Sequence, residues 1–194
     1  IRPGHVARAG KVYRMSRNEL VGIALATKGD ASRRHAREWE STRIAVRDFF
    51  AENALTPQVL RQGRFERYEA DGLAILCGNF FDLTPELLQD VSAVYDRASL
   101  IALPHELRTR YAEHSVVILP AAAGTLLVTM EYPQNEMSGP PFAVREDEVH
   151  RLYDKRYAVT SLLSKDILVE NPRFRERGLS ALSEKVYRLA PRPL

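Results

Sequence analysis

An acidic and a basic residue stand together at the point where a predicted strand ends. Asp96 and Arg97 directly follow the short apolar segment at residues 92–95. In open α/β sheets, residues just past the carboxyl end of a strand face the crevice that binds ligands. Arg97 could there hold a carboxylate or stabilise a thiolate through its planar set of N–H donors. A structural Asp–Arg pair that braces the loop explains the two residues equally well.

A second pair of candidate residues follows another apolar segment, residues 73–77. Gly78 is followed by Asn79 and Phe80. An Asn amide both donates and accepts hydrogen bonds, so Asn79 could bind the edge of an adenine, while Phe80 could stack on its ring. The alternative is a glycine turn with an exposed amide and a core phenylalanine.

Two further segments have the composition of binding loops. Residues 132–142 form a long connection after an apolar run, and loops of this length in compact domains are often lids or binding loops. Residues 171–178 are basic and contain Arg173. The five histidines have no metal-ligand spacing, and we predict no metal site. The single cysteine, Cys77, lies in an apolar run and is expected to be a small core side chain.

The elements that must position these residues alternate along the chain. Apolar spacing predicts helices near residues 44–52, 104–119 and 144–153, and Thr84 with Pro85 predicts another helix start. Strands are predicted at residues 73–77, 92–95, 124–131, 157–163 and 185–189. This alternation predicts a doubly wound α/β fold with a mostly parallel sheet, and the last two strands could form an antiparallel edge.

The first 42 residues give weaker signals. Residues 20–26 could be a strand or a helix, and residues 31–37 are polar and basic without a clear period. A nucleotide-binding sheet usually opens with a strand, a glycine-bearing turn and a helix. The nearest candidate for that turn is Gly10 with Lys11.

Length and composition are those of an ordinary globular domain. The chain has 194 residues, of which 45% are hydrophobic and 27% charged, enough for one core. Its apolar runs are too short to span a bilayer, and no signal segment opens it, so we expect no membrane partner and a cytoplasmic location.

Basic residues are concentrated at the amino-terminal end. Residues 1–43 hold ten Lys or Arg against four Asp or Glu, a net charge of +6, whereas the rest has a net charge of −3. A basic arm can bind nucleic acid. This arm has only Tyr13 and Trp39 as aromatic residues and no recognisable reading helix, so we expect no nucleic-acid partner.

Several collinear motifs resemble one family, the bacterial thiopurine S-methyltransferases. They are IAVRDFFAE (44–52), GNFFDLT (78–84), VYDRA (94–98), GPPF (139–142), PRFRERGL (172–179) and EKVY (184–187). The resemblance covers residues 44 to about 189, roughly three quarters of the chain.

The resemblance implies a class I S-adenosylmethionine-dependent methyltransferase fold, Rossmann-like, with a carboxyl-terminal antiparallel hairpin. It implies methyl transfer from S-adenosylmethionine to the sulfur of a small aromatic or heterocyclic thiol, and in bacteria also to selenium and tellurium compounds. By motif position, Arg97 corresponds to a cofactor- and substrate-side arginine and Arg173 to a second arginine at the substrate mouth. Asn79 and Phe80 correspond to the adenine-side turn, where bacterial members usually have Asp in place of Asn79. We expect a monomer.

The amino-terminal segment departs from the family. Glu40 falls where a ribose-binding acid should lie, but residues 37–39 before it do not form a buried strand, and a chance match is equally plausible. We therefore divide the chain into a divergent or disrupted basic segment, 1–42, and a methyltransferase domain, 43–194, incomplete at its amino-terminal side. A frame slip, a misplaced start or a degraded gene would explain the loss of pattern. The alternative function is a non-enzymatic or inactive remnant without a complete cofactor site.

Overall fold

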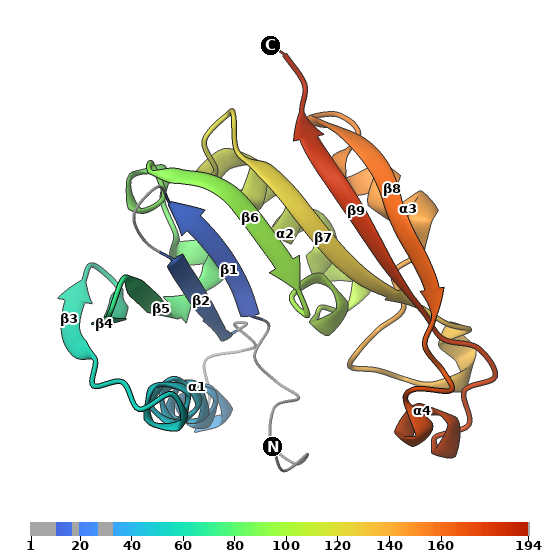
Figure 1. The fold of residues 1–194 in the computed structure, drawn as a ribbon, viewed down its shortest axis with the longest axis horizontal. Coiled ribbons are helices and arrows are strands. Elements are labelled where there is room, and N and C mark those ends of the chain that lie inside the picture. Colours follow the sequence, from blue (N-terminus) through green and yellow to red (C-terminus); the bar gives the residue numbers. More distant parts are fainter. Residues whose placement is uncertain (1–10, 17–19, 27–32, 194) are drawn as a thin grey trace.

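The computed structural model describes residues 11–16, 20–26 and 33–193, with side chains from residue 42 onward. Nine strands form one sheet with four α-helices around it (Figure 1). The elements are β1 (Lys11–Ser16), β2 (Leu20–Ala26), α1 (Arg33–Glu52), β3 (Gln58–Gln62), β4 (Phe65–Ala70), β5 (Leu73–Asn79), β6 (Val91–Arg97), α2 (His105–Ile118), β7 (Gly124–Glu131), α3 (Glu146–Tyr153), β8 (Tyr157–Asp166), α4 (Pro172–Glu176) and β9 (Ser183–Pro191).

The strand order confirms the predicted class of fold. The order is β3-β4-β5-β2-β1-β6-β7-β9-β8, and the last two strands form the expected antiparallel hairpin at one edge. Six of the nine described strands point in one direction (β2, β3, β5, β6, β7 and β8). Only β2 with β5 and β6 with β7 are parallel neighbours, so the sheet is mixed. Most strands point the same way, but many of them are separated by a strand that runs in the opposite direction.

The central strand β1 runs against the strands on both of its sides. It pairs antiparallel with β2 and with β6. Only residues 17–19 connect β1 to β2, and a parallel pair needs a crossover of a dozen or more residues, so the two strands must form a hairpin. Gly10 with Lys11 was the nearest candidate in the sequence for a glycine turn after a first strand, but Lys11 instead begins β1. Gly10 lies outside the described residues.

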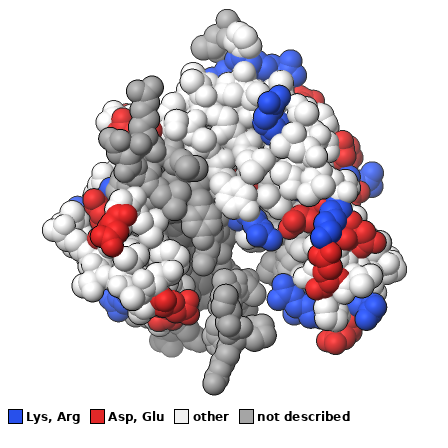
Figure 2. Space-filling view, viewed as in Figure 1, with Lys and Arg blue, Asp and Glu red and all other residues white. Residues whose placement is uncertain are grey.

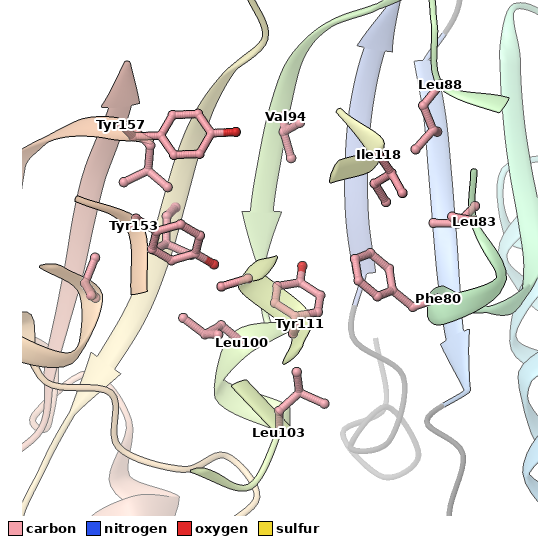
Figure 3. Packing of buried hydrophobic residues seen from close by; sticks show 14 of the residues in the cluster. Phe80, Leu83, Leu88, Val94, Leu100, Leu103, Tyr111, Ile118, Tyr153 and Tyr157 are labelled. Atoms are coloured by element: carbon pink, nitrogen blue, oxygen red, sulfur yellow. The ribbon is translucent and has the colours of Figure 1, made fainter. Parts of the chain in front are cut away.

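Two hydrophobic cores lie on opposite faces of the sheet. In β5, Leu76 packs into the large core with α2 and α3, whereas Ile75 and Cys77 pack into a smaller core with α1. Alternate residues of a strand point to opposite faces, so β5 is buried on both sides, as its continuous apolar run predicts. The large core includes the stacked rings of Phe80 and Tyr111, 4.6 Å apart (Figure 3).

Several predicted elements differ in extent from the observed ones. The helix predicted at residue 44 begins at Arg33, and within it Val46 and Phe50 are buried while Ile44 is 48% exposed, so Ile44 does not belong to the packed face. The helix expected from Thr84 is a single 3₁₀ turn at Pro85–Leu87, because Leu88 leaves helical geometry immediately after it. The β3–β4 hairpin was not predicted, nor was α4.

The close packing under β5 gives a test of the fold. A Cβ added at Gly78 would overlap the ring of Phe65, which is 2% exposed and would have to shift within the packed core. Gly78→Ala should therefore lower the free energy of unfolding by about 1–3 kcal/mol in urea titrations. At Gly124 the nearest atom to an added Cβ, the Leu189 carbonyl oxygen, is 3.5 Å away, so Gly124→Ala should change stability by less than about 0.5 kcal/mol. Equal effects of the two changes would contradict this packing.

Candidate active site

The carboxyl ends of four strands meet at one edge of the sheet, which is the lower edge in Figure 1. Because β2, β5, β6 and β7 share a direction, Ala26, Asn79, Arg97 and Glu131 all lie along this edge. The reversed strand β1 brings its amino-terminal residue, Lys11, to the same edge beside Arg97. The predicted site residues Asn79 and Arg97 are thus placed on a common rim, where α/β sheets bind ligands.

Asp96 and Arg97 point to opposite faces of the sheet. Asp96 is buried, and its Oδ2 accepts a hydrogen bond of 2.8 Å from the Tyr111 hydroxyl of α2. Arg97 is exposed on the other face and donates from Nη2 to Oε2 of Glu184 at 3.2 Å. Asp96 and Arg97 therefore do not form the structural pair that the sequence allowed, and each has a separate partner instead. Asp96 has a structural contact, and Arg97 faces solvent.

The turn after β5 combines a capping amide with a core ring. Asn79 is 5% exposed, and its side-chain oxygen accepts a hydrogen bond from the Phe81 backbone N–H at 3.3 Å. Phe80 is 1% exposed and packs between Tyr111 and His114. The structure therefore agrees with the alternative for Phe80, a core side chain, because its ring has no surface left for an adenine. The amide of Asn79 is buried rather than exposed, contrary to that alternative.

Glu40 does not follow a strand. It lies inside α1, and the strand that precedes this helix, β2, already ends at Ala26. Its side chain lies outside the described residues. A ribose-binding role for Glu40 therefore stays a prediction from the sequence motif.

Arg173 lies on the short helix α4, next to the long loop at residues 132–143. Phe174 of α4 packs in one cluster with Tyr132 and Ala143 of that loop. Glu136 of the loop accepts hydrogen bonds from the Ser180 backbone N–H at 2.8 Å and from its hydroxyl at 2.6 Å. The Arg173 guanidinium lies over the Phe174 ring at 5.0 Å and is exposed. Loop and helix thus form one unit that carries Arg173.

The same loop is fixed at both of its ends. The Tyr132 hydroxyl donates to the Pro141 carbonyl at 2.6 Å, and the Ala143 N–H donates to the Gln134 side chain at 2.9 Å. The Phe142 N–H donates to the Ile101 carbonyl at 2.7 Å, next to the end of β6. These bonds connect the loop to the rim and fix its conformation. They suit a fixed binding loop better than a mobile lid.

A large cleft opens on the helical face of this rim. Its volume is about 1450 Å³, and its walls come from the first turns of α2 and α3, the loop 132–143 and the start of β9. Arg97, Arg173, Asn79 and Phe80 do not line it. Sequence reasoning missed several of its charged residues, which are distant in the sequence, among them Arg108, Glu148 and Lys185.

The charges in this cleft neutralise one another. Arg108 is 3% exposed and donates to Glu148 at 2.7 Å, and His105 and Arg151 also lie within 3.5 Å of the same carboxylate. Lys185 contacts Glu131 at 2.8 Å and Glu146 at 3.1 Å. The hydrogen bond to Glu131, helped by Glu146, raises the pKa of Lys185 well above its usual value despite burial. These groups brace α2, α3 and β9 and leave little free charge for a ligand.

Among the described residues, no cluster of three or more His, Cys, Asp or Glu side chains is arranged to hold a metal ion, and no helix is long and apolar enough to cross a membrane.

Comparison with protein-family models identifies the family of this chain. Residues 33–192 match the model of the thiopurine S-methyltransferase family. The chain belongs to the thiopurine S-methyltransferase family. The resemblance inferred from the sequence motifs is thereby confirmed, and the match begins at the first residue of α1, ten residues before the domain boundary expected at residue 43.

Named relatives agree with this assignment. The thiopurine S-methyltransferase of Nitrosospira multiformis is 50% identical over 153 residues, covering 79% of this chain and 70% of the relative. That of Azotobacter vinelandii is 50% identical over 148 residues, covering 76% and 68%. Among solved structures, the arsenic(III) S-adenosylmethionine methyltransferase of Chlamydomonas reinhardtii is 16% identical with a TM-score of 0.47, covering 87% of this chain and 56% of that one. The family is one of methyltransferases, and its methyl donor is S-adenosylmethionine.

Burial of Cys77 allows a test of its predicted role as a core side chain. The thiol is 2% exposed, and burial together with the charge of Glu66 raises its pKa to about 11. A raised thiol pKa leaves almost no thiolate near neutral pH, and the thiolate is the reactive form. At pH 8 the folded chain should therefore react negligibly with a thiol-specific chromogenic disulfide, and one thiol should react after unfolding in urea. Rapid reaction of the folded chain would contradict a purely structural role.

Proposed function

We propose that this chain transfers the methyl group of S-adenosylmethionine to the sulfur of a small aromatic or heterocyclic thiol, and that selenium and tellurium compounds are further acceptors. The observation that carries the proposal is the exposed Arg97 at the end of β6, on a rim shared with Asn79, in a chain of this family. We further propose that the protein acts as a cytoplasmic monomer on small molecules, without nucleic acid or membrane.

The described residues fit the cofactor at two points. The side-chain oxygen of Asn79 is occupied by the Phe81 N–H, and its amide nitrogen makes no hydrogen bond to any other described residue, so it can donate to an adenine ring nitrogen. Arg97 can receive the carboxylate of the amino-acid end through N–H donors that Glu184 does not use. Strand β5, which carries Asn79, lies three strand spacings from β6, which carries Arg97, a distance of about 14 Å. This distance suits a cofactor with a nucleoside at one end and an amino acid at the other.

When bound, S-adenosylmethionine supplies an activated methyl group for in-line displacement by sulfur. The chain's task is then to align the acceptor and to exclude water. An aromatic thiol ionises readily, and the fixed positive charge of Arg97 favours its thiolate, so no strong general base is needed. We assign to Arg173, which α4 carries against the loop 132–143, a role in binding the acceptor.

The reversed strand β1 favours a second candidate function. In nucleotide-binding sheets the central strand ends at the rim in a glycine turn and a helix, whereas here its amino-terminal end lies there. A family member with this hairpin could keep the sheet and yet hold no cofactor. Binding of S-adenosylhomocysteine separates the two candidates.

The test is calorimetric titration of the purified chain with S-adenosylhomocysteine, followed by a methyl-transfer assay with an aromatic thiol. We expect micromolar binding, weakened about 10- to 100-fold by Arg97→Ala, because a charge-assisted hydrogen bond is lost. Arg188→Ala is the matched control, since Arg188 is an exposed arginine on the same sheet face, higher up β9. Absence of binding by the folded wild-type chain would favour the second candidate.

A further inference from the structure

Arg97 is held across a neighbouring strand by a single carboxylate. Strand β7 lies between β6 and β9, so the Arg97 side chain must pass over β7 to reach Glu184. Arg97 is level with Val128 of β7, while Glu184 is level with Met130, two residues nearer to the rim. The contact therefore directs the guanidinium diagonally toward the edge of the sheet. Figure 2 shows this face, with charged side chains of both signs gathered at the lower right around α4.

The contact leaves most of the guanidinium open. Only Nη2 donates to Glu184, at 3.2 Å, and the Arg97 side chain is 58% exposed. A guanidinium has five N–H donors in one plane, so fixing one of them also fixes the directions of the others. The remaining donors are the ones that the proposed function assigns to the cofactor carboxylate or the acceptor sulfur.

Glu184 is itself in a fixed position. Its backbone pairs with Met130 on one side and with Lys165 on the other. The next residue, Lys185, points to the opposite face and is bound there by Glu131 and Glu146. The Glu184 side chain is only 25% exposed. The carboxylate is thus attached to a part of β9 that is held from both sides of the sheet.

An exposed ion pair of this kind contributes little to folding stability, because solvent screens it. Its larger effect is on the freedom of Arg97. A long exposed side chain loses rotamer entropy when it binds a ligand, and a contact that orders it beforehand reduces that loss. The function of such a pair is therefore seen in binding and turnover more than in stability.

We propose that Glu184 is a positioning residue for Arg97: it orders the guanidinium across β7 so that its free donors face the ligand at the rim. This inference rests on the proposed function. Glu184 touches neither cofactor nor acceptor in this role and acts only through Arg97.

The test compares Glu184→Ala and Glu184→Gln with the wild-type chain in S-adenosylhomocysteine binding and in methyl transfer to an aromatic thiol. Glu184→Ala should lower kcat/KM about tenfold, mainly through a higher acceptor KM, with an unchanged melting temperature. Glu184→Gln keeps one acceptor oxygen and should lose less. Arg64→Gln, which breaks another exposed ion pair of 3.2 Å with Asp82, is the control and should leave both readouts unchanged.

A double-mutant cycle distinguishes positioning from a structural role. Glu184→Ala should weaken S-adenosylhomocysteine binding in the wild-type background and have no further effect when Arg97 is already Ala. Equal losses in both backgrounds, or wild-type kinetics in Glu184→Ala, would overturn the role of Glu184 while leaving the methyltransferase proposal intact. A wild-type chain that neither binds nor transfers methyl would overturn both.

Discussion

The shortness of the connection between β1 and β2 is the constraint on which the rest of the sheet depends. Three residues allow only an antiparallel hairpin, and this hairpin fills the centre of a nine-stranded sheet. The strands on either side of β1 keep their common direction, so β2, β5, β6 and β7 still end on one rim. Between β5 and β7, β1 is therefore the only reversed strand, and its amino-terminal end occupies the middle of the rim while the ends of β5 and β6 stay on either side.

The two flanks of the rim have different characters. At the end of β5, the Asn79 side chain is buried and caps the following turn, and the Phe80 ring is buried against Tyr111. Beside β6, Asp96 is taken up by Tyr111 while Arg97 remains exposed. Family membership makes methyl transfer the natural interpretation of this rim, and the exposed guanidinium is the group on which that interpretation depends most.

Much of the fold could be predicted from the sequence where one periodicity dominates. The apolar runs of β5 and β7 were recovered because both strands are largely buried and their sequences are correspondingly apolar. The closing β8–β9 hairpin was recovered although most of β8 is exposed. Strand β4 was missed because its buried residues, Phe65 and Tyr68, are three apart and enter cores on opposite faces, a spacing more typical of helices. The turn at Gly63, between β3 and β4, was the available signal for that hairpin.

The site was less predictable than the fold. Residue type and position at a strand end identified Arg97, but its partner Glu184 lies 87 residues away in the sequence. The same holds for Arg108 and Glu148, which are 40 residues apart and meet only when α2 and α3 pack side by side. Phe80 was misjudged in one interpretation because an aromatic residue after a strand can point outward or inward, and only the position of Tyr111 decides which.

The alternation of β9 at Glu184 and Lys185 has a consequence for how this segment can vary. Consecutive residues of opposite charge face opposite sides, one toward Arg97 and the other toward Glu131 and Glu146. Inserting or deleting one residue before β9 would exchange them, because a one-residue slip turns every side chain to the other face. Three carboxylates would then crowd one side and two cations the other. Substitutions in this strand are thus local events, whereas length changes before it would invert the charge pattern of both faces at once.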